Sequence, residues 1–164
     1  MEFFDAIRGR HSVREFKQRP VSKEIVEVMV DAGRLASTAR NLQPWHFVGS
    51  LDKRILIQVS ELAPNAAFCK DASAIVAIFS DDTKYYLEDC CAATQNILLA
   101  AHALGLGGCW VAGDKKDYCD KIKEMFKVPK DKKLVSIVVV GHPVDNIQKT
   151  PKKHLKEMMH WEKW

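Results

Sequence analysis

Apolar residues recur along the chain with two periods, which predict helices alternating with strands. Apolar spacings of three and four residues predict helices, and these cover residues 2–8, 23–36, 53–62, 84–104 and 117–126. Uninterrupted apolar runs rich in β-branched residues predict buried strands, and these cover residues 45–49, 74–79, 109–113 and 134–140. On this pattern alone, a doubly wound parallel sheet is one possible arrangement.

The predicted helix at residues 23–36 has a defined start and an expected core face. Ser22 precedes its first turn as a candidate N-cap, and Glu24 lies in that turn, where a negative charge is favourable. The apolar stripe expected to face the core contains Ile25, Val28, Met29, Ala32, Leu35 and Ala36.

The longest predicted helix, residues 84–104, is apolar on most of its faces. A helix of this kind must be buried on several sides. It is either a central core helix or a helix that packs against a partner subunit as well as its own sheet. The small residues Cys90, Cys91, Ala92 and Ala93 would allow another backbone to approach closely.

The last stretch of the chain, residues 144–164, has few apolar residues before Met158, Met159, Trp161 and Trp164. Such a segment cannot form a core alone, so it predicts an arm that lies on another surface. The chain has no internal repeat and no linker. Residues 1–164 are therefore expected to form a single domain, with residues 144–164 as its C-terminal arm.

Composition narrows the class of protein. With 164 residues, 47% of them hydrophobic and 28% charged, the chain can bury the core of one domain. The net charge of +4 arises from bases interleaved with acids, which favours small anionic ligands over nucleic acid. No apolar run approaches the roughly 18 residues of a membrane span. Five cysteines without a C-x-x-C pair or a secretory signal indicate a reducing cytoplasm and argue against a metal site.

An anion site is the first candidate for chemistry. Arg10, Ser12 and Arg14 alternate along a segment expected to be extended or turn-like, so their side chains point the same way. Two guanidinium groups and a hydroxyl on one face can hold a phosphate at several oxygens. The spacing alone more often reflects two surface arginines beside a loop serine, so the interpretation depends on other motifs.

Two other polar residues are expected to be structural. His46 lies beside aromatic residues in a predicted strand, where a histidine is more often packed or hydrogen-bonded than catalytic. Cys109 has no adjoining histidine or metal motif, which favours a core thiol over a nucleophile.

Several motifs follow one another along the chain. They are R-H-S-V-R-E-F at residues 10–16, N-L-Q-P-W-H-F at 41–47, G-L-G-G-C-W-V-A-G at 105–113, and V-S-I-V-V-V-G-H-P at 135–143 before a basic tail. In this order the chain resembles the short members of the nitroreductase family of FMN-dependent oxidoreductases. The resemblance implies an α+β fold, with a mixed, mainly antiparallel central sheet wrapped by helices. It also implies an intertwined homodimer with FMN at the subunit interface, and an arm that crosses to the partner.

The resemblance further implies which residues bind FMN. Contacts to the phosphate and ribityl chain would come from Arg10, His11, Ser12 and Arg14, with added charge from Lys152 and Lys153 in the arm. A loop containing Asn41 and Gln43 would approach the flavin, usually from the other subunit. The strand end Val111, Ala112 and Gly113 would lie against the flavin N5 side, with the backbone N–H groups of Ala112 and Gly113 directed towards N5.

Two departures from the family pattern affect these assignments. The family often has arginine in its C-terminal basic motif, whereas this chain has Lys152, Lys153 and His154. Residues 64–72 match the family poorly, and Lys70 is the candidate there for a flavin contact.

The implied activity is ping-pong hydride transfer from NADH or NADPH through FMN to a nitroaromatic, quinone or similar flat acceptor. The flavin carries this chemistry, so no catalytic side chain and no metal are expected. One alternative is a dehalogenase or flavin-consuming enzyme of the same fold, but such enzymes need a lid insertion over the flavin, which the chain lacks. Another alternative is a non-catalytic FMN-binding protein. A nucleic-acid-binding module that uses the lysine tail belongs to a different class again. Rapid bleaching of bound flavin by NAD(P)H without air would separate an enzyme from a carrier.

Overall fold

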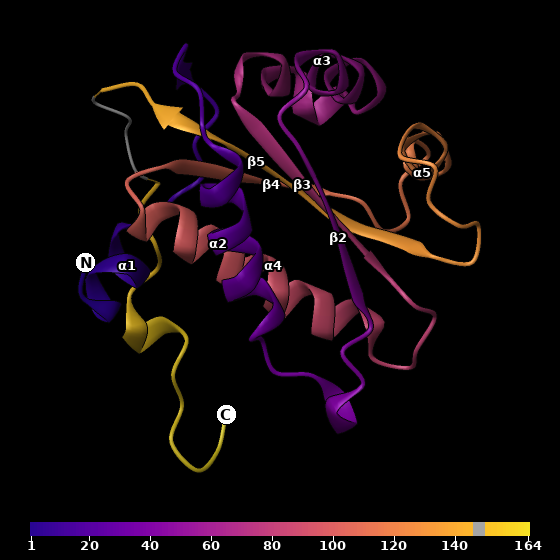
Figure 1. Cartoon of the computed structure of the whole chain (residues 1–164). Helices are drawn as coiled ribbons and strands as arrows, with labels where there is room; N and C mark the ends of the chain where they lie inside the picture. Colours follow the sequence, from indigo (N-terminus) through magenta and orange to yellow (C-terminus); the bar gives the residue numbers. More distant parts are fainter. Residues whose placement is uncertain (146–149) are drawn as a thin grey trace.

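The chain forms a central sheet with helices on both faces, as Figure 1 shows for the computed structural model, which describes residues 1–145 and 150–164. The helices are α1 (Phe3–Gly9), α2 (Lys23–Arg34), α3 (Lys53–Leu62), α4 (Tyr86–Ala103) and α5 (Cys119–Met125). The strands are β1 (Phe16–Lys17), β2 (Trp45–Ser50), β3 (Ala74–Ser80), β4 (Gly107–Ala112) and β5 (Lys133–Pro143). Short 3-10 helices are η1 (Ala39–Asn41), η2 (Pro64–Asp71) and η3 (Leu155–Glu157).

Every helix and strand expected from the periodicity is confirmed. Strand β1 and the 3-10 helices have no counterpart in the predicted pattern. Strand β1, η1 and η3 are too short to show a period, and η2 is interrupted by a kink at Ala66. Residues 146–149 of the expected arm lie outside the described residues.

Strand β5 organises the sheet. Along the same residues it pairs antiparallel with β3 on one edge and β4 on the other, and its last two residues pair with β1. Strand β2 pairs antiparallel with β3 and completes the order β1-β5-β3-β2. A single bridge between Ser12 and Gly108 is parallel. The sheet is therefore mixed and mainly antiparallel, which rules out the doubly wound parallel arrangement.

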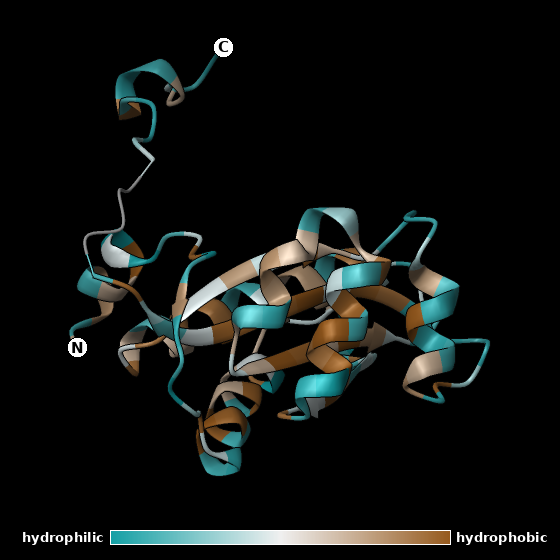
Figure 2. Ribbon diagram, turned by 90° about the horizontal axis from the view of Figure 1, so that it is seen from above, coloured by the Kyte–Doolittle hydropathy of each residue, from teal (hydrophilic) through white to brown (hydrophobic). Residues whose placement is uncertain are grey.

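Alternate side chains of β3 enter two separate cores. Ile75, Ala77 and Phe79 face α3, η2 and α5. Ala74, Val76 and Ile78 face α2 and α4. Because both faces are covered, the strand needs apolar residues at every position, which explains its uninterrupted apolar run. Figure 2 shows the apolar strands between helices with hydrophilic outer turns.

Helix α2 begins as expected but turns a different face inwards. The Ser22 hydroxyl accepts a hydrogen bond from the Ile25 N–H at 3.4 Å. Val28 and Leu35, which were expected in the core, are 54% and 66% exposed. The buried positions are Val26, Met29 and Gly33. Gly33 sets this face, because a Cβ added there would lie 2.7 Å from Cγ1 of Ile97 on α4.

Helix α4 is a core helix on one side only. Its residues Cys90, Ala93, Ile97 and Ala101 are fully buried. Its residues Cys91, Ala92, Leu99 and Ala100 are only half-buried. The helix, which was expected to be buried on several sides, therefore retains an apolar face that this chain does not cover completely. No helix among the described residues has both the length and the apolar character to cross a membrane.

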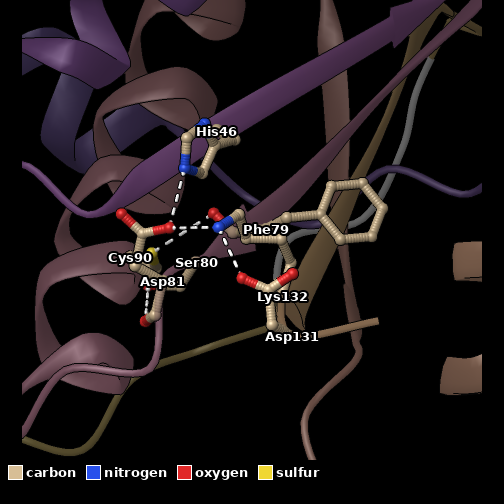
Figure 3. A network of polar contacts seen from close by, with 7 residues as sticks. All are labelled: His46, Phe79, Ser80, Asp81, Cys90, Asp131 and Lys132. Carbon is tan, nitrogen blue, oxygen red and sulfur yellow. Dashed lines mark hydrogen bonds and ion pairs between the residues drawn. The ribbon is translucent and has the colours of Figure 1, made fainter. Parts of the chain in front are cut away.

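A polar network holds the ends of β2 and β3 to the turn before β5 (Figure 3). The Asp81 carboxylate accepts from Lys132 Nζ at 2.8 Å and lies 3.1 Å from His46 Nε2, and Lys132 also pairs with Asp131 at 2.8 Å. The hydrogen bonds from Lys132 and His46 hold the pKa of the Asp81 carboxyl below its usual value. His46 is thus a hydrogen-bonded histidine, as expected from its setting.

Replacing Phe79 with alanine should lower the free energy of unfolding by about 3–5 kcal/mol, because its removal leaves a cavity in the core. The ring is fully buried and lies edge-on to Phe126, with ring centroids 6.3 Å apart. Ile57→Ala on α3 is the control, since Ile57 is 39% exposed, and its cost should stay below about 1 kcal/mol. Urea unfolding measures both variants, and equal losses would contradict this core assignment.

Candidate functional site

The segment from Arg10 to Arg14 leaves α1 in an extended conformation and lies along the start of β4. The Val13 N–H donates to the Gly108 carbonyl at 3.0 Å, and the Val13 side chain is buried. Because side chains alternate in an extended chain, Ser12 and Arg14 point to the opposite side, away from the core. The local geometry expected for this segment is therefore confirmed.

This segment lines a cavity of about 610 Å³ that gathers positive charge. The described residues around it are Ile7, Arg8, Arg10, His11, Ser12, Arg14, Thr150 and Lys152. The set contains four cationic side chains and no acid. The cavity therefore suits a ligand group with more than one negative charge, such as a phosphate.

The guanidinium groups at the cavity have aromatic neighbours rather than acidic ones. Arg8 lies over the Phe4 ring at 5.5 Å, and Arg14 lies over the Phe68 ring at 5.9 Å. Within residues 1–145 and 150–164, none of Arg8, Arg10 and Arg14 makes an ion pair with a carboxylate. Their charges therefore remain available to an anion in the cavity.

His11 presents an unsatisfied acceptor beside the arginines. Its Nδ1 lies 2.9 Å from the Gly9 carbonyl oxygen, so Nδ1 carries the proton and Nε2 is the acceptor of the neutral ring. Nε2 is buried and has no hydrogen-bond partner among the described residues. A ligand hydroxyl could satisfy it, because a buried polar atom without a partner is costly.

The outer edge of β4 carries a second set of available groups. Because backbone groups alternate along a ladder and the Gly108 carbonyl points away from β5, the N–H groups of Trp110 and Ala112 also point away from β5. The Ala112 carbonyl accepts from the Tyr118 hydroxyl. The N–H of Ala112 therefore remains directed outwards at the end of the strand.

The expectation for Gly113 needs correction. Its N–H donates to the Val135 carbonyl at 3.0 Å, so it cannot also be offered to a flavin. A Cβ at Gly113 would lie 2.9 Å from the Val135 backbone, so glycine is required there by strand packing. Val111 is buried, and its side chain packs in the same core cluster as Ile122 of α5.

Asn41 and Gln43 lie far from the cationic cavity within one chain. The Asp89 side chain, near the start of α4, holds the loop around η1 through hydrogen bonds. Gly9, which lies between the cavity residues Arg8 and Arg10, packs against His102 near the other end of α4. These two α4 residues are thirteen positions apart, or about 20 Å at 1.5 Å per residue. Figure 1 shows α1 and the turn between α2 and β2 at opposite ends of α4.

Of the two arm lysines expected at the phosphate, one lines the cavity. Lys152 lines it, whereas Lys153 does not belong to the described lining. Lys70 is exposed on η2 and is also outside this lining.

Sequence reasoning missed four residues at this site: Ile7, Arg8, Phe68 and Thr150. Arg8 lies in the last turn of α1, where a basic residue is already explained by the helix dipole. Phe68 and Thr150 approach the site only through the tertiary fold, and no local pattern signals them.

The cysteines show no sign of chemical activation. All five are free thiols, and burial raises the pKa of Cys69 to about 12 and that of Cys90 to about 11. Burial also raises the pKa of Cys109, although Arg14 and a hydrogen bond with Ser12 act against it. Cys109 therefore stays protonated at neutral pH. In the part of the chain that is described, no three potential metal ligands come together.

Both the sequence and the fold of this chain match known proteins. The sequence model of the nitroreductase family matches residues 7–63 and 52–142. The chain belongs to the nitroreductase family. It is 32% identical over 172 residues to an Archaeoglobus fulgidus protein provisionally named "NADH dehydrogenase/NAD(P)H nitroreductase", and the match covers 99% of each chain.

Solved structures of nitroreductases have the same fold. An FMN-dependent nitroreductase of Clostridium difficile R20291 matches with a TM-score of 0.90 at 28% identity, over 99% of this chain and 100% of that one. A Desulfovibrio desulfuricans protein, provisionally named a nitroreductase and solved in complex with FMN, matches with a TM-score of 0.86 at 27% identity, over 98% and 96% of the two chains. The expected α+β nitroreductase-like fold is therefore confirmed.

A double-mutant cycle tests the packing of the cationic segment on β4. A Cβ at Gly107 would lie 2.7 Å from Cβ of Val13, so Gly107→Ala should cost about 1–3 kcal/mol of unfolding free energy through overpacking. Val13→Ala makes room for the added methyl group. The double variant should therefore lose less unfolding free energy than the sum of the two single losses, by about 0.5 kcal/mol or more. Urea unfolding gives the four values, and strictly additive losses would contradict this contact.

Proposed function

We propose that this chain is an FMN-dependent oxidoreductase that takes hydride from NADH or NADPH and passes it to a flat acceptor such as a nitroaromatic or a quinone. Bound FMN supplies the hydride-transfer chemistry. The observation that carries the proposal is a cavity whose described lining has four cationic side chains and no acid. It lies beside the edge of β4 from which the N–H groups of Trp110 and Ala112 point outwards. The names of the relatives in the same family support the donor and the cofactor.

The cationic cavity fits the polar end of FMN. Arg10, Arg14 and Lys152 would hold the doubly charged phosphate, and the Ser12 hydroxyl would donate to one of its oxygens. The orphaned His11 Nε2 would accept a hydrogen bond from a ribityl hydroxyl. Lys152 is preferred over Lys153 because only Lys152 lines the cavity.

The strand end fits the ring end of FMN. The outward N–H of Ala112 would donate to N5, which is an acceptor in the oxidised flavin. Tyr118 restrains the adjacent peptide by donating to the Ala112 carbonyl. A backbone donor orients the ring without a titrating side chain, so the protein contributes position and exclusion of water rather than acid–base catalysis.

We propose that the complete site needs a second copy of the chain. The flavin loop with Asn41 and Gln43 lies about 20 Å along α4 from the cavity, which supports its use in the partner's site. A partner subunit would also cover large apolar side chains on α1, since Phe3 and Phe4 are 66% and 62% exposed. Exposed clusters of this kind mark interaction surfaces.

The arm supports the same assembly. Figure 2 shows it reaching away from the body of the protein. Every described residue from 150 to 164 is exposed, and Trp161 and Trp164 are 73% and 100% exposed. An intertwined homodimer, in which each arm crosses to the other subunit, would bury these side chains. We place the enzyme in the cytoplasm, where its five free thiols would persist.

Replacing both Arg10 and Arg14 with alanine should weaken FMN binding, because each loses a charge-assisted hydrogen bond to the phosphate. The expected loss is roughly 10- to 150-fold in affinity for each arginine. Fluorescence titration of the apoprotein measures it. Riboflavin, which lacks the phosphate, is the control ligand, and its affinity should change little. Unchanged FMN affinity in the double variant would refute the phosphate assignment.

Cys109→Ser should keep FMN bound and retain most of the NADH or NADPH oxidation rate, because the thiol is buried and protonated. Stopped-flow spectroscopy follows flavin reduction and then reoxidation by a quinone or nitroaromatic. Complete loss of reduction with FMN still bound would reveal a catalytic thiol. A wild-type protein that binds FMN but is not bleached by NADH or NADPH would be a carrier, not an enzyme.

A further inference from the structure

The loop between α2 and β2 adopts an unusual backbone conformation. Arg40, Asn41 and Gln43 have positive φ angles of 55°, 56° and 49°. This left-handed region is tolerated by asparagine but is unfavourable for Arg40 and Gln43, whose side chains do not relieve the clash of the Cβ. Such strain persists only where surrounding contacts hold it, and it is concentrated at functional sites.

One buried carboxylate on α4 holds the start of this loop. Asp89 is 5% exposed, and its Oδ2 accepts from the Thr38 hydroxyl at 2.7 Å. Its Oδ1 and Oδ2 accept from the Ala39 N–H at 3.1 and 3.3 Å. The Thr38 oxygen in turn accepts from the Gln43 N–H at 3.0 Å, so the contact extends to the far side of the loop. The Gln43 amide nitrogen also donates to Asn41 Oδ1 at 3.1 Å.

The end of the loop is anchored separately. The buried Pro44 offers its carbonyl to the Asp81 N–H at 2.9 Å, and the Asp81 side chain belongs to the network in Figure 3. The six residues from Thr38 to Gln43 therefore lie between two fixed points, one on α4 and one at the end of β3.

We infer that Asp89 is a positioning residue, which pre-forms the loop so that Asn41 and Gln43 can contact the flavin bound by the partner subunit. The inference rests on the proposed function. Asp89 lies in the first turn of α4, where the helix dipole favours an acid, but an exposed acid such as its neighbour Glu88 meets that preference without the cost of burial. Among the described residues, the Asp89 carboxylate accepts its hydrogen bonds from Thr38 and Ala39 of the loop, and these bonds fix the strained segment before any ligand arrives. Ordering a loop in advance lowers the entropy lost on binding.

The first experiment uses matched substitutions. Thr38→Val removes the hydroxyl at nearly constant volume, whereas Thr38→Ser keeps it. Thr38→Val and Asp89→Asn should each weaken FMN binding or slow flavin reduction by about tenfold or more, and Thr38→Ser should retain most of both. Glu88→Gln is the charge control, because Glu88 neighbours Asp89 but is exposed. Wild-type affinity and reduction rate in Thr38→Val and Asp89→Asn would overturn the inference.

The second experiment separates positioning from general stability. Asp89→Asn and Arg10→Ala/Arg14→Ala chains, each with its own tag, are co-expressed and the mixed dimer is purified. If the loop serves the partner's site, one site of the two combines intact arginines with an intact loop. The mixed dimer should then show about half of the wild-type activity, while both parent dimers stay low. A mixed dimer no more active than its parents would overturn the inference.

The outcomes also separate this inference from the proposed function. Wild-type protein that does not take up FMN, or is not reduced by NADH or NADPH, would refute the proposed function. Active wild type with unaffected Asp89→Asn protein would leave the function standing and refute only the positioning role. A shift of the urea midpoint in Asp89→Asn, with FMN affinity and flavin reduction unchanged, would likewise assign Asp89 a purely structural role.

Discussion

The antiparallel pairing of β5 with both β3 and β4 is the constraint on which the rest of the molecule depends. Because β4 pairs with β5 along one edge, only the other, outer edge of β4 can bind anything else. The register of that ladder decides which backbone groups point outwards, and it directs the Gly108 carbonyl and the Ala112 N–H to the same side. The segment from Arg10 to Arg14 then docks beside Gly108, so the ladder also sets the place of the cationic cavity.

Much of the fold could be predicted from the sequence because it is encoded in local periods. The two faces of β3 require an uninterrupted apolar run, and the extended segment around Ser12 requires alternation of the arginines. Tertiary contacts decided the rest. Helix α2 turns Val28 outwards because Gly33 packs against Ile97, and neither apolar period reveals that contact. Gly113 looked available from its place at a strand end, but the ladder register directs its N–H to Val135.

The candidate site was predictable to the extent that its residues lie in contiguous motifs. Arg10, Ser12 and Arg14 share a strand-like segment, so their common direction follows from sequence. Arg8 joins the same cavity from a helix, and nothing in its local sequence indicates it. Lys152 joins from the arm, where the family resemblance, and not the spacing of residues, had implied a basic contact. The resulting concentration of positive charge, with no acid among the described lining residues, opposes folding through self-repulsion. A bound anion would relieve that repulsion, so ligand binding and stability are thermodynamically linked.

Helix α4 sets the distance between the loop around η1 and the cationic cavity. Its first turns hold the strained loop through Asp89, and its last turns pack against the residue that precedes the arginines. Because an α-helix has 3.6 residues per turn, inserting or deleting one residue within α4 would rotate one end against the other by about 100°. Point substitutions on the outer face leave this geometry intact. The length of α4 is therefore less free to vary in evolution than the identity of its outward-facing side chains.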